Sequence, residues 1–533
     1  MDTRKLVAIP EDKGIHIKTA GVKREKYVYK YIKYYRNEEG EARSKAKAIG
    51  KYDETTGKMQ PNGNYYEMYK IDAEMADITV LEYGYQYLIR EISKKIGLTE
   101  SLREAFGKEA TDIINIAGYI IREGNAMDGI EDWQQRNYMA ENSHILNSQT
   151  TSKIFGEISI QGQEAFFKDW VGKAYNGGSV FYDVTSISSY SKEMTEVEWG
   201  YNRDGDKLAQ FNIGMFCDKE TKTALYYNRY NGSLTDKSNL SYVMANANAV
   251  GIKEVSMIVD GGFFDEKCFQ GLREYCKSFT VGMPGKLVES KDAIAKYGDG
   301  IDSYTNKLTD KHHIYCRQIE TEIYGSQGRM LLYYDVYSHA SKCDEISEEI
   351  ERLKLELSGL KRYPRAKLAR YKPYFTIAKH RDGNGFDYSV DAQKVEKLRK
   401  DKGYFLIFTT EKDLSPSDIL AYYRDKDADE KLFSQIKVDM DGSRIRTHST
   451  QTTVGKVFVT FIACLIRNYI MHKLSGYLSD HSTSLKKIFN QLSNIIIIKG
   501  VAGFRFTKAL TKNQRSILST FDLANDIITS LKT

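Results

Sequence analysis

The sequence predicts an α/β protein with a mixed β-sheet flanked by helices. The first observation is that residues 178–284 alternate between apolar runs of strand length and helical patterns. The second is an apolar run at residues 404–410, which indicates a buried strand and is followed by a helical segment at about residues 418–437. With 533 residues, 41% of them apolar, the chain is long enough for about three or four domains with sizeable cores.

The charge of the chain is unevenly distributed. The formal charge is only +6, but residues 1–72 hold 16 Lys and Arg against 11 Asp and Glu, which suggests a polyanionic partner near the N-terminus. The six cysteines are scattered without a CxxC pair, so we expect reduced thiols rather than a disulfide framework or a zinc site. No signal peptide is expected, and the longest apolar run, residues 457–466, is too short to span a bilayer, so we predict a cytoplasmic protein with no membrane partner.

The N-terminal third of the chain shows two patterns. Residues 25–50 alternate as strands do around a turn at Gly40, which predicts a hairpin. Because Lys and Arg alternate with Tyr there, one face of this hairpin is suited to phosphates; an ordinary surface hairpin is the alternative. Residues 82–172 change to helical patterns with short turns, typical both of modules that read DNA and of many structural domains. Residues 150–156 are a candidate recognition helix.

The core begins with three consecutive predicted strands, at residues 179–187, 209–216 and 223–230. A helix, a strand, a second helix and a further strand follow, up to residue 284. Three strands followed by alternating helix and strand is the order of a ribonuclease-H-like core, a mixed sheet flanked by helices.

Residues 285–403 interrupt this core with several strand-like runs, a charged helix at about residues 344–360 and the basic tract KRYPRAKLARYK, which predicts a β-rich insertion. A long apolar helix at about 454–474 and a helical tail, with the run IIII at 495–498 as a buried element, complete the chain. The predicted organisation is therefore a basic hairpin region at 1–80, a helical DNA-binding region at 81–172, the core at 173–284 and 404–475, the insertion at 285–403 and the tail at 476–533.

Two aspartates stand out in the predicted core strands. Asp183 interrupts the apolar strand FYDVT, where a buried carboxylate is costly unless a cation compensates its charge. Asp260 closes the apolar strand VSMIVDGG, and carboxyl ends of strands are common places for ligand-binding acids. A strand aspartate bonded to nearby backbone and an ordinary Asp-Gly turn are the alternatives. Asp204 and Asp236 lie in turn-like strings and are expected outside this site.

The helical segment at 418–437 supplies a third acid. At about 100° per residue, Tyr423, Lys426, Glu430 and Lys437 share one stripe of this predicted helix. A solvated helix stabilised by pairs such as Lys426 with Glu430 is the alternative. Three carboxylates around a cleft suit Mg²⁺, and two such ions promote phosphoryl transfer by activating the attacking oxygen and stabilising the leaving one.

These residues resemble the DDE transposases of bacterial insertion sequences, in the IS4-like branch with the signature Y-x2-R-x3-E-x6-K. Here the signature occurs as Tyr423, Lys426, Glu430 and Lys437, with the related spacing of Phe433 and Ile436 also met. The strings FYDVTS and IVDGGF are similar to those around the first two acids of this family, and Gln210 and the string NGSLTD also have counterparts. The sequence departs from the family at Lys426 and Gly261, where arginine is usual.

The resemblance implies a cut-and-paste transposase that binds the terminal inverted repeats of its element, hydrolyses a strand at each end and joins the 3′-OH ends to target DNA. It implies that Asp183, Asp260 and Glu430 hold two Mg²⁺, for which Mn²⁺ can substitute, and that Tyr423, Lys426 and Lys437 bind phosphates, with Arg424 partly replacing the missing arginine. It further implies a homodimer on DNA and a location at the bacterial nucleoid. The alternatives are a former transposase that binds DNA without cutting it and a nuclease or resolvase on the same core.

Overall fold

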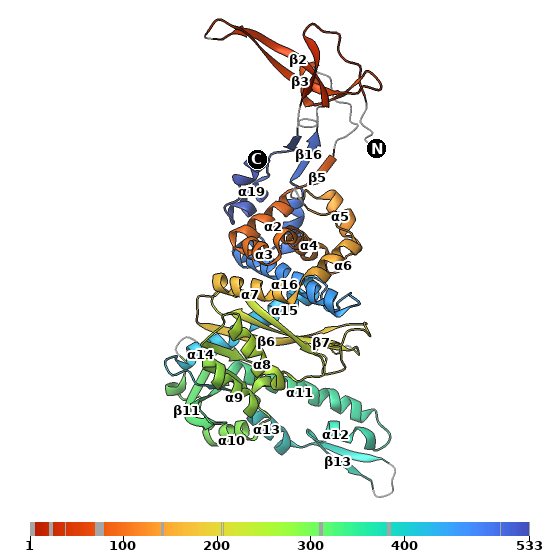
Figure 1. Ribbon diagram of the computed structural model, residues 1–533. Coiled ribbons are helices and arrows are strands. Elements are labelled where there is room, and N and C mark those ends of the chain that lie inside the picture. The colour runs from red at the N-terminus through yellow and green to blue at the C-terminus, as the bar shows by residue number, and fades with distance from the viewer. Residues whose placement is uncertain are drawn as a thin grey trace. The chain divides into compact units, whose positions relative to one another are not determined.

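The computed structural model describes residues 6–20, 25–37, 39–69, 79–139, 143–203, 205, 207–308, 313–380, 385–500 and 503–531, without the side chains of residues 427–430. Asp204 therefore lies outside the described residues, as does the side chain of Glu430. The chain folds into two compact units, each assembled from separate segments (Figure 1). Unit 1 contains Met1–Ile92, Asp128–Ser148 and Ile470–Thr533, and unit 2 contains Ser93–Met127 and Gln149–Tyr469.

Unit 2 is built on one large mixed sheet, as the sequence predicts. In the described part of the chain this sheet has eight strands, in the spatial order β11 (Ile314–Ile323), β12 (Ser326–Asp335), β15 (Tyr404–Thr409), β10 (Cys276–Met283), β9 (Val255–Val259), β6 (Ser179–Ser188), β7 (Gln210–Asp218) and β8 (Ala224–Asn231). Strand β9 runs parallel to β6 and to β10, whereas the other neighbouring pairs are antiparallel. The predicted strand–helix order of residues 178–284 is thus confirmed.

Helices pack on this sheet because its strands are apolar on both faces. Every residue of β7 is buried. Helix α16 (Thr450–Lys473) lies over Ile187, Ile213 and Met215 of the sheet, with which it shares a small apolar cavity. Helix α7 (Ile160–Ala174) is fixed to β8 by Trp170, whose indole N–H donates to the carbonyl of Ala224 at 3.1 Å. Helices α8 (Asp236–Ala249) and α9 (Glu266–Tyr275) pack against each other in the connections between β8, β9 and β10.

Helix α16 is longer than the apolar run from which the sequence prediction was made. By length and composition alone it is the one helix among the described residues that qualifies as a candidate membrane span. Its most apolar window is 83% buried inside the protein, as is usual for the core helix of a large unit.

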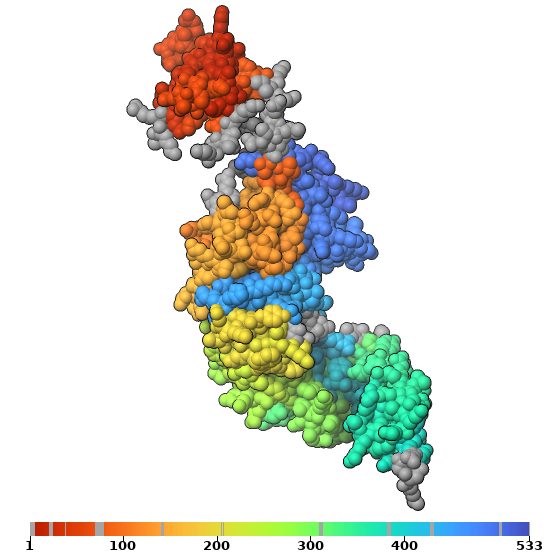
Figure 2. Space-filling view, turned by 90° about the vertical axis from the view of Figure 1, so that its right-hand side faces the viewer, coloured from red at the N-terminus to blue at the C-terminus, as the bar shows by residue number. Residues whose placement is uncertain are grey.

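The insertion at residues 285–403 is not largely β, so this prediction is wrong. Strands β11 and β12 join the main sheet, but they have ten residues each, whereas helix α11 (Val336–Ser358) alone has 23. Helices α10 (Val288–Tyr297), α12 (Leu368–Tyr371) and α13 (Ala392–Lys400) add to the helical share, and α11 and α13 form a separate small core with β13 (Phe375–Lys379) and β14 (Phe386–Val390). Figure 2 shows this part, in teal, as a lobe beside the body of the unit. The sequence prediction missed the first turns of α11 because the apolar run RMLLYYDVYS, residues 329–338, continues the strand pattern of β12 into them.

The N-terminal part of unit 1 is a four-stranded antiparallel sheet with the order β1-β2-β3-β4, where β1 is Ile15–Ala20, β2 is Glu25–Arg36, β3 is Ala42–Tyr52 and β4 is Met59–Pro61. The predicted hairpin is confirmed as β2 and β3, with Gly40 at a φ of 80° in the turn (Figure 1). Val28, Ile49 and Met59 form the core, which residues of helix α1 (Gly63–Tyr69) cover.

The helical segments of residues 81–172 are divided between the two units. Helices α3 (Leu98–Phe106), α4 (Ala110–Glu123), α6 (Ser148–Glu157) and α7 belong to unit 2, whereas α5 (Ile130–Arg136) and most of α2 (Gly84–Lys95) belong to unit 1. The candidate recognition helix is α6, which buries Thr151, Ile154 and Phe155. On its exposed side Lys153 lies 3.8 Å from Glu157, so the basic side chain is balanced by an acidic one.

The C-terminal segment of unit 1 includes a strand where a helical tail was predicted. The run IIII leads into β16 (Ile496–Gly500), which pairs with β17 (Gly503–Phe506) on one side and β5 (Thr79–Glu82) on the other. Ile495 and Ile497 are buried, as predicted, but β-branched side chains favour a strand over a helix here. The remaining elements, α17 (Ser475–Asp480), α18 (Leu485–Ser493), α19 (Lys512–Ser519) and α20 (Asp526–Thr529), are helical.

Candidate functional site

Asp183 and Asp260 occupy neighbouring positions in the sheet: Asp183 lies within β6, and Asp260 directly follows the parallel strand β9. The register of β6 and β9 aligns Tyr182 with Val259, so the next residue of each chain segment is an aspartate. Strand β9 ends at this point, whereas β6 continues to Ser188. Because neighbouring strands lie about 4.8 Å apart, the two carboxyl groups share one place at the carboxyl end of β9.

The two aspartates have different surroundings. Asp183 is partly buried, and its Oδ1 accepts the backbone N–H of Val184 at 2.8 Å. The pKa of Asp183 is raised to about 6, chiefly by burial and also by the nearby charge of Asp260, although the Val184 N–H, Lys426 and Arg203 act in the opposite direction. The side chain of Asp260 is 52% exposed and therefore faces solvent at the same place.

Tyr423 and Lys426 both reach Asp260 from the helix that follows β15. The Tyr423 hydroxyl donates to Oδ1 of Asp260 at 3.3 Å, and Nζ of Lys426 lies 3.5 Å from the same oxygen. The lysine side chain is only 9% exposed. Burial raises the pKa of Tyr423 and the charge of Asp260 adds to this, so the phenol stays protonated as a hydrogen-bond donor.

The predicted helix at 418–437 is not continuous. It consists of α14 (Pro416–Asp425), α15 (Asp427–Ser434) and a π-helical turn at Gln435–Asp439. The first break falls at Lys426, whose buried side chain turns towards Asp260. Since a π-turn has more residues per turn than an α-helix, the uniform stripe that the sequence predicted does not extend to Lys437.

The remaining predicted site residues lie as follows. The backbone of α15, which carries Glu430, runs against β6, the strand of Asp183. Lys437 is half-buried in the π-helical turn. Arg424 points instead to Asp335 at the end of β12, where its guanidinium lies 3.3 Å from Oδ2 of this acid. The structure therefore brings Tyr423, Lys426 and the two aspartates together and places Arg424 on a different acid.

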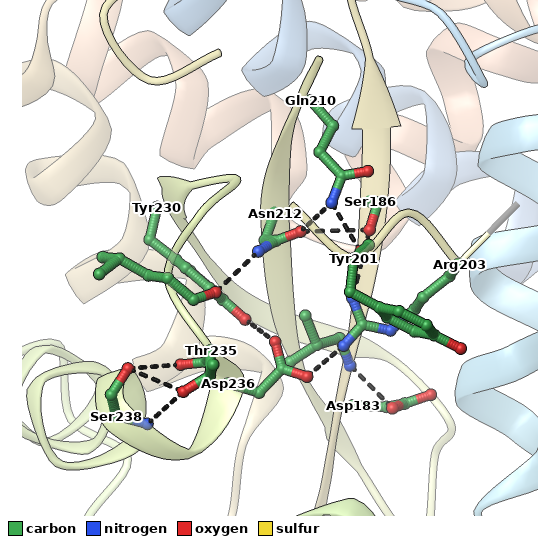
Figure 3. A network of polar contacts seen from close by, with 12 residues as sticks. Asp183, Ser186, Tyr201, Arg203, Gln210, Asn212, Tyr230, Thr235, Asp236 and Ser238 are labelled. Carbon is green, nitrogen blue, oxygen red and sulfur yellow. Dashed lines mark hydrogen bonds and ion pairs between the residues drawn. The ribbon is translucent and has the colours of Figure 1, made fainter. Parts of the chain in front are cut away.

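A polar network lies beside Asp183 (Figure 3). The guanidinium of Arg203 donates to Asp236 and, at 3.3 Å, to the hydroxyl of Ser186 on β6. Tyr230 donates its hydroxyl proton to the second oxygen of Asp236. Arg203 thus ties the connection between β6 and β7 to the N-terminal end of α8, and its positive charge lowers the pKa of Asp183.

Gln210 extends this network along the sheet. Its amide donates to the carbonyl of Tyr201 at 2.7 Å and lies 3.5 Å from Oδ1 of Asn212, and the hydroxyl of Ser186 donates to the same Asn212 oxygen at 3.1 Å (Figure 3). The motif residues Gln210 and Asp236 therefore support one network around β6. Asp236 contacts Arg203 rather than the aspartate pair.

Two residues of this site were missed in the sequence. Arg203 lies in a polar connection that contains no recognisable motif. Its role in the site is visible only from its contacts with Ser186 and Asp236 in the folded protein. Gly282 on β10 makes room for Tyr423, because a Cβ there would lie 2.0 Å from the phenol oxygen. A glycine within an apolar strand run often marks such a close approach, and this signal was available in the string SFTVGMP.

The donor set of the site fits a hard divalent cation. The described residues contain no group of three His, Cys, Asp or Glu side chains that could hold a metal ion. Asp183 and Asp260 nevertheless offer oxygen atoms only, which suit Mg²⁺. Burial without full compensation raises the pKa of Asp183, and a cation at this place would provide the missing positive charge.

Comparison with known proteins gives one family and structural neighbours. Residues 178–466 match the family described as Transposase DDE domain. None of the curated proteins matches the chain. Among solved structures, a piggyBac transposase synaptic complex with hairpin DNA is similar, with 11% sequence identity, a TM-score of 0.37, and coverage of 84% of this chain and 82% of that one.

Proposed function

Because the chain belongs to the transposase DDE domain family, we propose that it is the cut-and-paste transposase of a bacterial insertion sequence. It binds the terminal inverted repeats of its element, cleaves the ends by metal-dependent hydrolysis and joins the 3′-OH ends to target DNA. The signature residues Tyr423, Lys426, Glu430 and Lys437 favour the IS4-like branch. The observation that carries this proposal is the alignment of Asp183 with Asp260 on adjacent parallel strands, inside the matched residues.

The core is proposed to be ribonuclease-H-like. Strands β6, β7 and β8 form an antiparallel meander, and β9 and β10 then add on the other side of β6 in parallel. With the strands numbered from β6, the spatial order is 3-2-1-4-5. Along the chain, three strands are followed by alternating helices and strands, the order from which such a core is inferred. Strands β15, β12 and β11 extend the sheet beyond β10.

Asp183, Asp260 and Glu430 are proposed to hold two Mg²⁺ ions, for which Mn²⁺ can substitute. Support for the third ligand is the contact of α15, the helix that carries Glu430, with β6, the strand of Asp183. Bound ions of this kind supply an activated attacking oxygen and stabilise the leaving oxygen of the scissile phosphate.

The other residues of the site act on the phosphate and on the acids. Lys426 is held within 3.5 Å of Asp260, so its charge is available both to this carboxylate and to a phosphate oxygen beside it. Tyr423 is positioned as a neutral donor at the same point. Lys437 and Arg424 are proposed as further phosphate contacts, and Arg424 must first exchange its contact with Asp335 for one with DNA.

The proposed partners are two element ends and a target duplex, which two copies of the chain hold together as a homodimer on DNA. The proposed location is the nucleoid in the bacterial cytoplasm. Joining requires that both ends are held at once, which is the reason to expect two copies.

The test is cleavage of a labelled duplex that carries the element end, with Mg²⁺ and full-length protein. We expect Asp183→Asn, Asp260→Asn and Glu430→Gln each to slow nicking by about 10³-fold or more, equivalent to about 4 kcal/mol of barrier. The matched control is Asp299→Asn, which changes an 89% exposed acid and is expected to nick like wild type. Normal nicking by any one of the three variants would contradict the assignment.

The same assay separates the alternative, a former transposase that keeps DNA binding. Its support is that Lys426 and Gly261 stand where the family usually has arginine. Binding of the end duplex by wild type without nicking in Mg²⁺ or Mn²⁺ would establish this alternative. Nicking followed by joining of the 3′-OH end to a second duplex would exclude it, and nicking without joining would indicate a nuclease or resolvase.

A further inference from the structure

The distal half of the β2–β3 hairpin is a two-stranded ribbon. Strand β1 pairs with β2 only from Glu25 to Lys30, and β4 pairs with β3 only from Gly50 onwards. Lys47 still faces Lys30 at the end of the part that β1 covers, and the N–H of Tyr31 donates to the carbonyl of Gly14 at 3.0 Å. Beyond this point, the described residues 31–36 and 42–46 form strand pairs only with each other. At about 3.3 Å per residue this ribbon is about 20 Å long.

One face of this distal ribbon is strongly basic. Arg43, Lys45 and Lys47 alternate along β3 and so point to the same side, and Lys33 lies directly opposite Lys45. All four side chains are exposed. Arg43 lies 2.7 Å from Glu41 in an exposed ion pair, whereas no acidic side chain among the described residues pairs with Lys33, Lys45 or Lys47. Like charges directly opposite each other destabilise an antiparallel pair, so this arrangement is explained by a partner that supplies negative charge.

The lysines at the base of the same sheet are arranged differently. Three of them have an acidic partner: Lys26 with Glu54, Lys30 with Asp12 and Lys51 with Glu25, all within 2.7 Å. Lys18 of β1 instead lies over the ring of Tyr31, with its Nζ 5.7 Å from the ring centroid. Most of the lysine charge at the base is thus balanced by acids, whereas that of Lys33, Lys45 and Lys47 is not. Aromatic and aliphatic side chains are exposed beside it, with exposed fractions of 69% for Tyr34, 48% for Tyr35 and 47% for Ile32.

We propose that this distal ribbon enters the major groove of duplex DNA, an inference that rests on the proposed function. The major groove is about 12 Å wide and admits a two-stranded β-ribbon, so the 20 Å length is sufficient to cross it. Lys33, Lys45 and Lys47 contact phosphates at the groove edge, while Tyr35 lies with Arg43 at the end that meets the bases. Duplex RNA is disfavoured, because the major groove of the A-form is too narrow for such an element.

The charge of the chain favours the ribbon over the helical region as the principal DNA contact. Residues 81–172 hold 9 Lys and Arg against 14 Asp and Glu, which gives a net charge of −5. Residues 1–72 have a net charge of +5, with 16 basic and 11 acidic residues. A surface that binds phosphates must supply positive charge, and of these two regions only the N-terminal one has an excess of it.

The test measures binding of full-length protein to a fluorescein-labelled DNA duplex of about 30 base pairs as a function of salt. For the triple variant Lys33→Gln, Lys45→Gln and Lys47→Gln we expect an affinity at least about tenfold lower. We expect the slope of log affinity against log salt to become less negative by about 2.7, since each lost phosphate contact contributes about 0.9. The triple variant with Arg at the same three positions is expected to bind like wild type, which excludes misfolding as the cause of any loss.

The matched control is Lys486→Gln, Lys487→Gln and Lys512→Gln, three exposed lysines of α18 and α19 in the same unit. This variant removes the same three positive charges. We expect its affinity for DNA and its slope of log affinity against log salt to equal those of wild type. A loss as large as that of the ribbon variant would overturn the proposal, and so would equally tight competition by an RNA duplex, which would indicate a general polyanion surface.

The outcome also separates this inference from the proposed function. If the ribbon variant binds DNA like wild type while wild type still nicks the end duplex, the ribbon assignment is wrong and the transposase assignment stands. If wild type neither binds nor nicks DNA, the proposed function fails and the ribbon assignment fails with it. Asp260→Asn is expected to bind with full affinity and not to nick.

Discussion

At the scale of single residues, two glycines determine how closely the helix of Tyr423 approaches the two aspartates. A Cβ at Gly282 would lie 2.0 Å from the Tyr423 oxygen, and a Cβ at Gly261 would lie 3.2 Å from the carbonyl oxygen of Gly282. The absence of side chains at both positions lets β10, the turn after Asp260 and the phenol meet. This offers a physical reason for glycine at 261, where the insertion-sequence transposases that the sequence resembles usually have arginine.

The first prediction concerns Gly282→Ala. The new methyl group must displace Tyr423, so we expect a loss of about 1–3 kcal/mol in the free energy of unfolding, together with slower nicking. Adding Tyr423→Phe to this variant removes the oxygen atom closest to the methyl group and is expected to recover part of the lost stability. Urea denaturation of both single variants and the double variant measures the coupling.

Gly285→Ala is the control for this pair of substitutions, because an added Cβ there has no heavy atom within 4 Å. Its stability is expected to stay within about 0.5 kcal/mol of wild type. Additive effects of Gly282→Ala and Tyr423→Phe would show that the phenol is not what the methyl group displaces.

The second prediction concerns Lys456, a lysine in the apolar helix α16 that is only 1% exposed. Its pKa is lowered to about 8, chiefly by burial and also by the charge of Arg446, although Asp441 acts in the opposite direction. Between about pH 8 and its ordinary value of 10.5, the unfolded chain keeps the proton that the folded chain has lost. The contribution of Lys456 to stability is therefore lowest below pH 8 and rises with pH across this interval.

We expect Lys456→Met to raise the free energy of unfolding at pH 7 by up to about 3 kcal/mol, the cost of keeping the buried amine charged. The advantage of the variant should shrink as the pH rises from 8 to 10.5. Chemical denaturation of variant and wild type at matched pH values tests this, with Lys168→Met, an exposed position on α7, as the control. A difference that does not change with pH would show that the amine is not desolvated in the folded protein.

At the scale of the elements, the sequence predicted the sheet strands well but not the geometry of the helix that carries the signature. Strands such as β6 and β9 are apolar runs of distinctive length, and their aspartates interrupt or close those runs. The break at Lys426 and the π-turn after Ser434 have no such local signal, since each depends on what the helix meets in space. The same holds for Arg203, whose partners on β6 and α8 come from other parts of the chain.

The third prediction belongs to the element β2–β3. Because Lys45 lies opposite Lys33, Lys45→Glu replaces a repulsive cross-strand pair by an attractive one and should stabilise the ribbon by about 0.2–1 kcal/mol. Slower hydrogen exchange at the amides of residues 31–36 is the expected result, accompanied by weaker DNA binding.

Lys58→Glu, in the exposed turn before β4, makes the same charge change outside the ribbon and is expected to leave the exchange of residues 31–36 unchanged. Faster exchange in the Lys45→Glu variant would mean that the facing lysines do not repel each other in the folded sheet.

At the scale of the whole molecule, both units are assembled from segments that are distant in sequence. The strand pair of β5 and β16 joins Glu82 to Ile496, and Tyr423 meets Asp260 across 163 positions. The sequence analysis divided the chain into consecutive domains. Such a division cannot predict contacts between segments that are far apart in the sequence. The large sheet was predictable because most of its strands follow one another, whereas unit 1 was not, because its three segments are separated by the whole of unit 2.

The fourth prediction follows from this discontinuity. A chain that ends at Asn494 lacks β16, the central strand of the sheet β17-β16-β5. We expect hydrogen exchange at Thr79–Glu82 to accelerate by at least about tenfold, because these amides and carbonyls lose their partners. The amides of β6 and β9 in unit 2 should keep their protection. A chain that ends at Leu523 and thus lacks only α20 is the control, and loss of protection in this control would point to a general destabilisation.

The excursion between β10 and β15 has a consequence for the cell that makes this enzyme. The ribosome completes both aspartates long before it reaches Lys426 and Glu430, since residues 285–403 are synthesised in between. A message or a reading frame interrupted anywhere in that interval therefore yields a product with Asp183 and Asp260 but without the helices that carry Tyr423, Lys426 and Glu430. On the proposed assignment, such a product lacks the third metal ligand and cannot cleave DNA.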